Sequence, residues 1–451
     1  MTLLRRFALS LTVVGLGLAL SPGDATACGG CFAPPGAAQV VTDHRMVLSL
    51  SSAQTTLWDQ FQYSGSPEEF SWILPIRYTD STRVQLASDD FLRVLDNVML
   101  PALQQPAPPP LPPGCRPPET EYDALPGSVQ DGAVFADASS VDTGVTVLRE
   151  EVVGPYAVAI VRGTSGMGLR DWLRMNGYSV PSAVEPVIDY YLGLNMDFVA
   201  LRLRPGKGLN RMVPVRVTLD GYQPRLPLRM IAAGVADHVG IALTVIAQAR
   251  IEAMNFPNLE LRDSDFVYDW AAAPSPSDYP RIFVDAYDTR NHAMGDRLWL
   301  TESSMDQSRD SLSSLASRLP PREGFAPVDG GTAMAMSSPV DDVNVAFTGL
   351  GATARVTRMR ADLSSRALDR DLDLAASDLG TRDRFYQFGT ERNRPAYSAC
   401  PWTDGSATPA IAEGIHCSVS RVSDRSLWES AAVFGVALAA LARRRRRGAT
   451  L

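Results

Sequence analysis

The sequence predicts an α+β fold: a β-rich, sandwich-like body of mostly antiparallel strands with a few short helices, preceded by a signal peptide and followed by a transmembrane helix. Three observations lead to this prediction. Short alternating or apolar runs recur along the chain, as in half-buried strands. Turn residues such as Asp220-Gly221 fall between successive runs, which indicates antiparallel hairpins. Only a few stretches carry an apolar stripe at helical spacing.

Composition restricts the function classes. The 451 residues are 45% hydrophobic and 20% charged, as in a globular protein of roughly two to four domains. Fifty acidic residues outnumber 42 basic ones, and the net charge is −8. No basic cluster interrupts the body of the chain, so we expect no nucleic-acid partner.

Residues 1–27 read as a signal peptide. Arg5 and Arg6 precede the apolar run Phe7–Leu20, and Ala25-Thr26-Ala27 forms a small-residue cleavage site before Cys28. The apolar run is too short for an ordinary membrane span, although an uncleaved anchor is an alternative. Acylation of Cys28 is a second alternative. We expect the signal peptide to direct export through the inner membrane and to be cleaved between Ala27 and Cys28.

Residues 417–451 read as a second targeting element. Cys417 and a polar spacer precede the mostly apolar run Leu427–Ala442, which is followed by the basic run Arg443–Arg447. An apolar segment directly before a cluster of Arg is typical of a stop-transfer signal, because cytoplasmic flanks carry positive charge. We therefore expect a short transmembrane helix and a membrane-anchored protein of the cell envelope or cell surface.

The same order of parts resembles the MYXO-CTERM type of C-terminal sorting signal of myxobacterial surface proteins. The resemblance implies cleavage near Cys417 by a sorting protease and display at the surface through a lipidated Cys417. The expected partners are the membrane and the export and sorting machinery. The mature body, residues 28–417, would hold 33 basic and 47 acidic side chains, a net charge of −14.

The remaining cysteines are Cys28, Cys31, Cys115 and Cys400. Disulfides persist in exported proteins, and four cysteines allow three connectivities. Both a Cys28–Cys31 pair and a Cys115–Cys400 link stay open. Redox catalysis by Cys28-Gly29-Gly30-Cys31 is disfavoured, because the prolines that follow prevent a helix from starting in register.

Residues 28–100 form the N-terminal β-rich part. We expect strands over Met46–Leu50, Thr55–Tyr63 and Phe70–Ile76, with Gly65-Ser66-Pro67 as a hairpin turn between the last two. The apolar stripe in Asp89–Met99 predicts a helix. Residues 101–144, with eight prolines between 106 and 118, read as a linker or long loop.

Residues 145–303 form a central α+β part. Short helices are expected at Leu169–Asn176, where Gly177 stops the helix, and at Ser182–Leu192. The expected strands are Val152–Val161, Phe198–Leu203, Val213–Leu219, Leu226–Ala232 and Ile241–Ile251.

Residues 304–416 form a more polar C-terminal part. A helix is expected at Ser308–Leu319, and strands are expected at Val343–Phe347 and Arg355–Leu363.

The body resembles DUF2330 proteins, a family of exported bacterial proteins with no assigned activity. The motifs that carry the resemblance lie between residues 28 and 370. They are Ala27–Phe32, Glu68–Pro75, Trp172-Leu173 with Asn176–Tyr178, Phe198–Leu203, Leu226–Arg229, Trp299–Glu302 and Thr357–Arg360. The resemblance implies no catalytic residue. It implies that the aromatic and apolar residues of these motifs are core.

Catalytic motifs are incomplete. Gly163–Met167 resembles a nucleophile elbow around Ser165, but Met167 stands where that motif has glycine. A hydrolase using Ser165 with His238 or His292 remains an alternative, and the other interpretation places Ser165 at a helix N-cap. Gly349–Ala354 matches a relaxed dinucleotide fingerprint, but the residues that follow alternate like a strand rather than a helix.

Metal motifs are also incomplete. Asp369, Asp371 and Asp373 have a spacing that can serve Ca²⁺, but the glycine and glutamate of an EF-hand loop are missing. A polar strand face or loop is the alternative. We therefore expect no metal and no cofactor.

These observations predict an exported, envelope-anchored protein that acts as a non-enzymatic surface binding or structural module. A secreted hydrolase and a Ca²⁺-dependent adhesin are the alternatives.

Overall fold

A computed structural model describes residues 31–32, 40–64, 71–113, 144–178, 184–204, 213–232, 237–319 and 338–397. By its internal contacts the chain divides into two units, Met1–Pro110 with Arg116–Ala396, and Leu111–Cys115 with Tyr397–Leu451. The elements and sites below belong to the first unit. Both predicted targeting segments lie outside the described residues.

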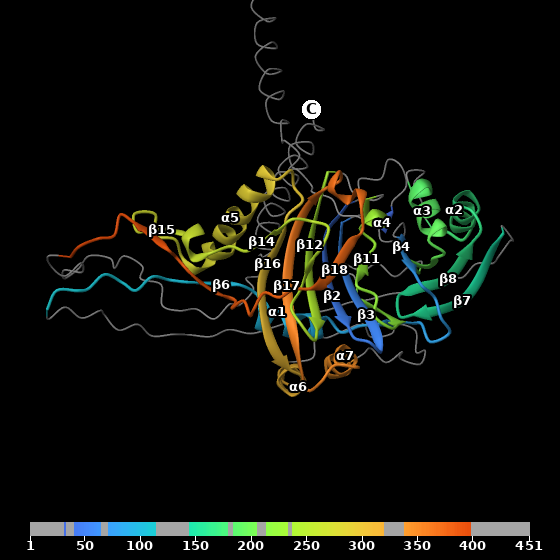
Figure 1. Ribbon diagram of the computed structural model, residues 1–451, viewed down its shortest axis with the longest axis horizontal. Coiled ribbons are helices and arrows are strands. Elements are labelled where there is room, and N and C mark those ends of the chain that lie inside the picture. Colours follow the sequence, from blue (N-terminus) through green and yellow to red (C-terminus); the bar gives the residue numbers. More distant parts are fainter. Residues whose placement is uncertain are drawn as a thin grey trace, which may run out of the picture. The chain divides into compact units, whose positions relative to one another are not determined.

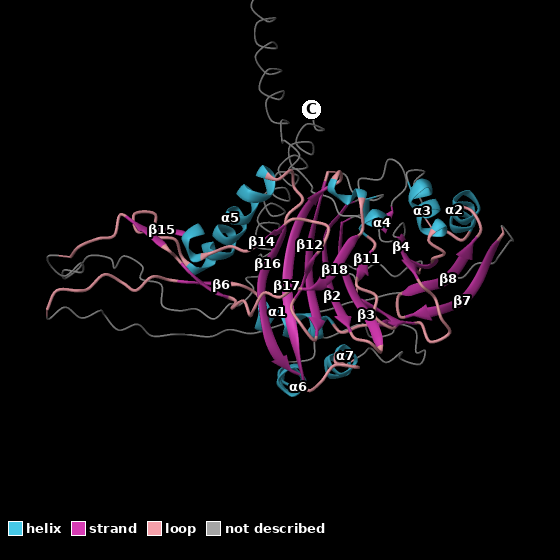
Figure 2. Ribbon diagram, in the orientation of Figure 1, coloured by secondary structure: helices cyan, strands magenta, loops and turns pink. Residues whose placement is uncertain are grey.

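The larger sheet has eight strands in the order β14-β16-β17-β12-β2-β3-β10-β5 (Figures 1 and 2). Neighbouring strands are antiparallel except for the parallel pairs β12–β2 and β14–β16. The strands are β2 (Val40–Leu50), β3 (Gln54–Ser64), β5 (Arg83–Leu86), β10 (Val215–Asp220), β12 (His238–Ala247), β14 (Asn258–Leu259), β16 (Trp299–Ser308) and β17 (Thr353–Ser364).

The smaller sheet has five antiparallel strands in the order β1-β4-β9-β8-β7. They are β1 (Cys31–Phe32), β4 (Ser71–Ile76), β7 (Val145–Val153), β8 (Tyr156–Gly163) and β9 (Asp197–Leu203).

The two sheets share one apolar core. Met46 and Leu48 of β2 belong to the same buried cluster as Trp72 and Leu74 of β4. Successive side chains of a strand point to opposite faces, so each sheet uses alternate residues for this core. The sandwich-like, mostly antiparallel α+β body predicted from the sequence is confirmed.

Helices cover the outer face of each sheet. On the larger sheet, Val47 and Trp58 pack with α1 (Asp89–Met99), α6 (Arg309–Arg318) and α7 (Pro339–Ala346). On the smaller sheet, Val161 and Phe198 pack with α2 (Gly166–Met175) and α3 (Glu185–Gly193), which lie beside β8 in Figure 1. The layers are therefore helix, sheet, sheet and helix.

Two smaller assemblies complete the unit. A three-stranded sheet, β11-β18-β13, adds to the shared core together with a short helix, α4. A separate aromatic cluster surrounds α5 and includes Phe266, Phe283 and Tyr386. The elements are α4 (Leu228–Ala232), α5 (Tyr279–Ala293), β6 (Ala102–Gln104), β11 (Arg225–Leu226), β13 (Ile251–Ala253), β15 (Val267–Asp269), β18 (Leu372–Ala376), β19 (Phe385–Gln387) and β20 (Thr390–Arg392).

Several predicted elements are found at their predicted places. The helix Asp89–Met99 has the predicted bounds, with Ser88 as its N-cap. The predicted helices near Leu169, Ser182 and Ser308 correspond to α2, α3 and α6, and Gly177 follows α2. The strands predicted at Thr55–Tyr63, Phe198–Leu203, Val213–Leu219 and Arg355–Leu363 correspond to β3, β9, β10 and β17.

Two predicted strands are helices instead. Leu226–Ala232 contains α4, which starts directly after Pro227. Val343–Phe347 lies mostly in α7, where Ser338 and Asp341 form a capping box and Pro339 occupies the first turn. Pro and a capping residue favour a helix start, and this outweighs the short apolar alternation on which the strand prediction depended.

The hairpin predictions need correction. Val152–Val161 is two strands, because Gly154, at φ +58°, and Pro155 turn the chain so that Val153 pairs with Tyr156. The strands on either side of Gly65-Ser66-Pro67 lie in different sheets, so they form no hairpin. Asp220-Gly221 does end β10, but the next strand, β11, pairs with β18.

The predicted segment boundaries cut across the sheets. The boundary at 303/304 falls inside β16, and β2, β12 and β17 from three predicted segments pair side by side. The predicted linker 101–144 contains β6, which pairs with β19. Residues 114–143 of that linker lie outside the described residues.

Candidate functional site

A histidine and an aspartate meet between the two sheets. His44 of β2 and Asp59 of β3 both point into the shared core, and both are almost completely buried. The Nδ1 atom of His44 lies 3.1 Å from Oδ1 and 3.2 Å from Oδ2 of Asp59. The register of β2 against β3 shifts between Val41 and His44, and such an irregularity re-aims the side chains next to it.

The pair lines a small cavity. Its volume is about 20 Å³, which is room for about one water molecule. The other walls are apolar and come from β2, β3, β4, β11 and α4. They include Met46, Leu57, Trp72, Leu74, Leu228 and Ile231.

The chemistry available in this cavity is proton binding. Burial raises the pKa of Asp59, and the neighbouring His44 opposes that rise. None of the described residues that line the cavity carries a hydroxyl or a thiol. In the described part of the chain, the cavity holds a buried hydrogen-bonded pair and a volume of about one water molecule.

A charged network lies on the opposite face of the larger sheet. Glu302 of β16 is fully buried, and it accepts hydrogen bonds from Nε of Arg358, at 2.7 Å, and Nε of Arg360, at 2.6 Å. Arg358 also contacts Asp96 of α1 at 2.7 Å, and Asp96 pairs in turn with Arg45 of β2.

Asp96 of α1 pairs directly with Arg45 of β2 and Arg358 of β17, and Arg358 links it to Glu302 of β16. Burial alone would raise the pKa of Glu302, but the two guanidinium groups reverse that effect and lower it overall. A buried carboxylate held ionised by two arginines is unreactive. Loss of either partner would cost stability.

The network joins two of the motifs that carried the family resemblance. Glu302 ends Trp299–Glu302, and Arg358 and Arg360 belong to Thr357–Arg360. Their pairing was not predicted. The signal was present, because Arg358 and Arg360 alternate along a strand and so share one of its faces.

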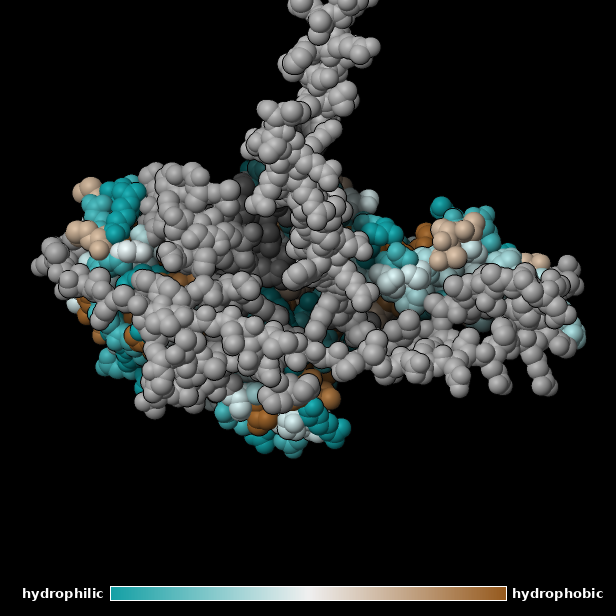
Figure 3. All heavy atoms as spheres, turned by 180° about the vertical axis from the view of Figure 1, so that it is seen from behind, coloured by the Kyte–Doolittle hydropathy of each residue, from teal (hydrophilic) through white to brown (hydrophobic). Residues whose placement is uncertain are grey.

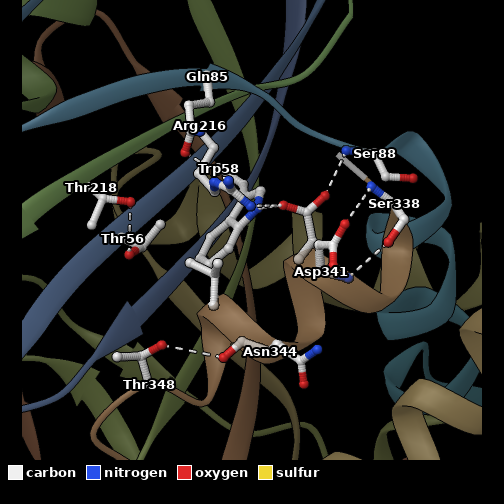
Figure 4. A network of polar contacts seen from close by, with 12 residues as sticks. Thr56, Trp58, Gln85, Ser88, Arg216, Thr218, Ser338, Asp341, Asn344 and Thr348 are labelled. Atoms are coloured by element: carbon white, nitrogen blue, oxygen red, sulfur yellow. Dashed lines mark hydrogen bonds and ion pairs between the residues drawn. The ribbon is translucent and has the colours of Figure 1, made fainter. Parts of the chain in front are cut away.

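A second buried carboxylate fastens α7 to the same face. Asp342 accepts hydrogen bonds from Nε1 of Trp58 at 2.8 Å, Nη1 of Arg216 at 2.6 Å and the backbone N–H of Ser88 at 2.7 Å. Figure 4 shows Trp58, Arg216 and Ser88 converging on the first turn of this helix. Burial raises the pKa of Asp342, against the effect of its donors.

Ser165 occupies the helix N-cap position that the sequence allowed for. Its hydroxyl accepts a hydrogen bond from the backbone N–H of Gly168 at 3.1 Å at the start of α2. His238 begins β12 and His292 lies near the end of α5, and both face Asp296 instead. The structure does not assemble the predicted Ser165 alternative with either histidine.

The glycines of the relaxed dinucleotide fingerprint form a turn between α7 and β17. Gly349 has φ +74°, and a Cβ placed on it would lie 2.6 Å from Oγ of Ser51. The strand predicted to follow is confirmed as β17, so no helix N-terminus follows the glycines.

The three aspartates of the predicted Ca²⁺ run have different partners. Asp369 pairs with Arg370, Asp373 pairs with Arg225, and the buried Asp371 accepts a 2.5 Å hydrogen bond from the hydroxyl of Tyr191. Within the described residues, no group of three or more acidic, histidine or cysteine side chains is arranged to hold a metal ion.

The predictions for the cysteines and the two ends fall largely outside the described residues. Cys31 lies in β1, opposite Trp72 of β4. Ala27, Cys28, Cys115, Cys400 and Cys417 are not described, and the predicted disulfides and cleavage sites stay predictions. Across the described ranges, no helix combines the length and the apolar character that a membrane crossing requires.

Comparison with known proteins gives one match. The model of a family described as "Uncharacterized protein conserved in bacteria (DUF2330)" matches residues 22–303. No curated protein and no solved structure matches the chain. The match includes Glu302 and ends before its partners Arg358 and Arg360, so the resemblance expected as far as residue 370 is shown only to 303.

Proposed function

The chain belongs to the DUF2330 family of uncharacterized bacterial proteins. We propose that it is an exported, envelope-anchored module with a binding or structural role. The single observation that carries the proposal is that the motifs of the family resemblance contribute buried residues. Trp72, Phe198, Trp299 and Glu302 are all buried in the body of the protein. These motifs therefore specify a framework.

The polar groups inside the framework support the same proposal. Glu302 is neutralised by two arginines, Asp342 is bonded to three donors, and His44 and Asp59 bond to each other. Groups paired in this way stabilise or position the layers. Catalysis in this interior would first require one of these pairs to open.

The surface and the two ends support export and anchoring. On the face seen in Figure 3, the described residues that are visible are mostly hydrophilic, with separate hydrophobic areas among them. The body between the predicted cleavage sites has a net charge of −14, which favours solubility and disfavours anionic surfaces. The basic n-region, the two apolar segments and the Arg443–Arg447 run are the sequence features that support anchoring.

Intact-mass spectrometry of the protein recovered from its native cell envelope, with and without reduction, tests export and anchoring. We expect the mass of a chain that starts at Cys28. Its C-terminus should either lie near Cys417, with the added mass of a lipid, or include the C-terminal Arg run. Reduction should add two protons for each disulfide. A mass that retains residues 1–27 together with a cytoplasmic location would overturn the proposal.

Two further measurements test the proposed role against the alternatives. Labelling by a broad serine-hydrolase probe that is lost in Ser165→Ala would overturn a purely binding or structural role. A melting temperature that rises with Ca²⁺ and falls with chelator would instead favour the adhesin, because a ligand that binds the native state stabilises it. We expect no labelling and an unchanged melting temperature.

A further inference from the structure

A cluster of titratable groups lies at the C-terminal end of α5, away from the sites described above. Asp296 stands between two histidines that are far apart in the sequence. Its Oδ1 lies 2.5 Å from Nδ1 of His292, and its Oδ2 lies 3.9 Å from Nε2 of His238. On the other side of His238, Nδ1 lies 3.7 Å from Oδ2 of Asp362.

The cluster joins three elements. His292 belongs to α5, His238 begins β12, and Asp362 lies near the end of β17. Asp296 is held in place by its backbone, since its N–H donates to the carbonyl of Asn291 at 2.9 Å and its carbonyl accepts from Ser364 at 3.0 Å. Its φ of +53° is unusual for a residue other than glycine, and such conformations are kept where the surrounding structure imposes them.

The charge of the cluster depends on the histidines. Asp288 of α5 adds a third carboxylate, which interacts with both His292 and Asp362. With both histidines neutral, the three carboxylates carry a charge of −3, and with both protonated the cluster carries −1. The other charged groups that act on it are Asp285 on α5 and Arg360 on β17, whose guanidinium is also bonded to Glu302.

The pKa directions agree with this geometry. The hydrogen bond to Asp296 raises the pKa of His292 above its ordinary 6.5. Burial, and then the neighbouring carboxylate, raise the pKa of Asp288, and burial is the first cause for Asp362 as well. All three pKa values are raised in the folded state, so the folded chain holds these protons more tightly than the unfolded chain. The contribution of the cluster to stability is therefore lost as the pH rises through the raised pKa values.

The movable part of the cluster is short. Tyr287 and Asn291 anchor the preceding turn of α5 through buried hydrogen bonds to the backbone of Asp362 and Leu298, and these bonds do not titrate near neutral pH. The imidazole side chain of His292 is 63% exposed and that of His238 is 33% exposed, so both can exchange protons with solvent. Residues 292–295, between Asn291 and the backbone-anchored Asp296, are therefore the segment that can respond.

We propose that this cluster is a proton-operated clasp, in which protonated His292, paired with Asp296 beside His238, holds the end of α5 against β12 and β17, and deprotonation of His292 loosens it. An exported protein meets the pH of its surroundings directly, but the clasp is a property of the fold and does not depend on location.

Hydrogen exchange of the full-length chain tests the clasp directly. Protection is measured by mass spectrometry on peptides covering residues 288–300, between pH 5.5 and 8, with correction for intrinsic exchange rates, in parallel series without and with chelator. We expect a several-fold loss of protection in this segment as the pH rises, with residues 279–287 unchanged. Asp296→Asn should abolish the dependence, whereas Asp310→Asn, at an exposed site on α6, should preserve it.

Titration of the histidine ring signals by NMR in the wild-type chain keeps the test independent of the variants. We expect the His292 ring to titrate above pH 6.5. Titration at or below 6.5, or corrected protection that does not change with pH, would overturn the proposal. A pH dependence that is abolished by the chelator would also overturn it, because a bound metal would then have been the controlling ligand.

Discussion

At the scale of single residues, buried charges decide which substitutions are costly. Glu302 and Asp306 lie on the same strand, and each pairs with an arginine of β17. Glu302 is fully buried against Arg358 and Arg360, whereas the side chain of Asp306 is 61% exposed beside Arg355. Removing one partner of a buried pair leaves an uncompensated charge, whereas an exposed pair is screened by water.

We therefore expect Glu302→Gln to lower the free energy of unfolding by about 3–5 kcal/mol. The matched variant Asp306→Asn should lower it by less than about 1 kcal/mol. Urea denaturation followed by tryptophan fluorescence measures both. Equal effects of the two substitutions would show that the buried network contributes no more than a surface pair.

His44 and Asp59 allow a test of whether their pairing is structural. His44→Leu leaves a buried carboxylate without its partner, so we expect a loss of about 1–3 kcal/mol in the free energy of unfolding. The double variant His44→Leu/Asp59→Leu removes both polar groups and should recover most of that loss. A double variant that is no more stable than His44→Leu would contradict a purely structural pair.

At the scale of elements, the placement of α7 depends on its first turn. Asp342 bonds to Trp58, Arg216 and Ser88, whereas its neighbour Asp341 is exposed and contacts only the helix cap at Ser338. The two carboxylates are neighbours in α7, but one is exposed and the other is buried.

Asp342→Ala should lower the free energy of unfolding by about 3–5 kcal/mol, because it removes the buried carboxylate to which Trp58, Arg216 and Ser88 donate. It should also shift the fluorescence of Trp58, whose indole N–H loses its acceptor. Asp341→Ala should cost less than about 1 kcal/mol and leave the emission unchanged. The chain has seven tryptophans, so the emission of Trp58 is taken as the difference between each protein and its Trp58→Phe counterpart. An unshifted difference spectrum in Asp342→Ala would mean that this carboxylate does not hold the indole.

Substitutions in the turn between α7 and β17 can distinguish a structural role of its glycines from a ligand-binding role. Gly349→Ala places a side chain at φ +74° and close to Ser51, so we expect a loss of about 1–2 kcal/mol. A Cβ on Gly351 would lie no closer than 3.7 Å to its nearest neighbour, so Gly351→Ala should change stability by at most about 0.5 kcal/mol. Thermal unfolding of both variants measures the difference. Comparable losses would contradict a turn that needs glycine only at 349.

At the scale of the whole molecule, the buried acidic side chains make the stability of the fold depend on pH. Burial raises the pKa of Asp59, Asp342 and Asp371 above the ordinary 3.8, so the folded chain binds protons that the unfolded chain releases. Their contribution to stability is therefore lost as the pH rises from about 3.8 through the folded values. Glu302 acts in the opposite sense, but only below its ordinary 4.5.

We expect the melting temperature of the full-length chain to be higher at pH 5 than at pH 8. Repulsion within a body of charge −14 acts in the same direction. Repeating the scan in about 1 M salt, where the Debye length is about 3 Å, screens the surface repulsion and leaves the effect of the buried acids. A melting temperature that rises from pH 5 to pH 8 would contradict this account.

The sequence by itself determined the fold class and the places of the elements whose signals are local. The apolar stripe and the Ser88 cap of α1 and the alternation in β3 and β17 depend on neighbouring residues, so they can be read directly. Where local signals compete, the helix prevailed over the predicted strand: α4 starts directly after Pro227, and α7 starts at a proline with a capping box.

Only the tertiary structure decided which side chains meet. Glu302 and Arg358, Trp58 and Asp342, and His238 and His292 are far apart in the chain, and the order of strands in a sheet sets their distances. No periodicity in one segment encodes that order, because pairing depends on the free energy of the whole packed core. The sites of this protein therefore follow from its topology, whereas its elements and its expected export follow from its sequence.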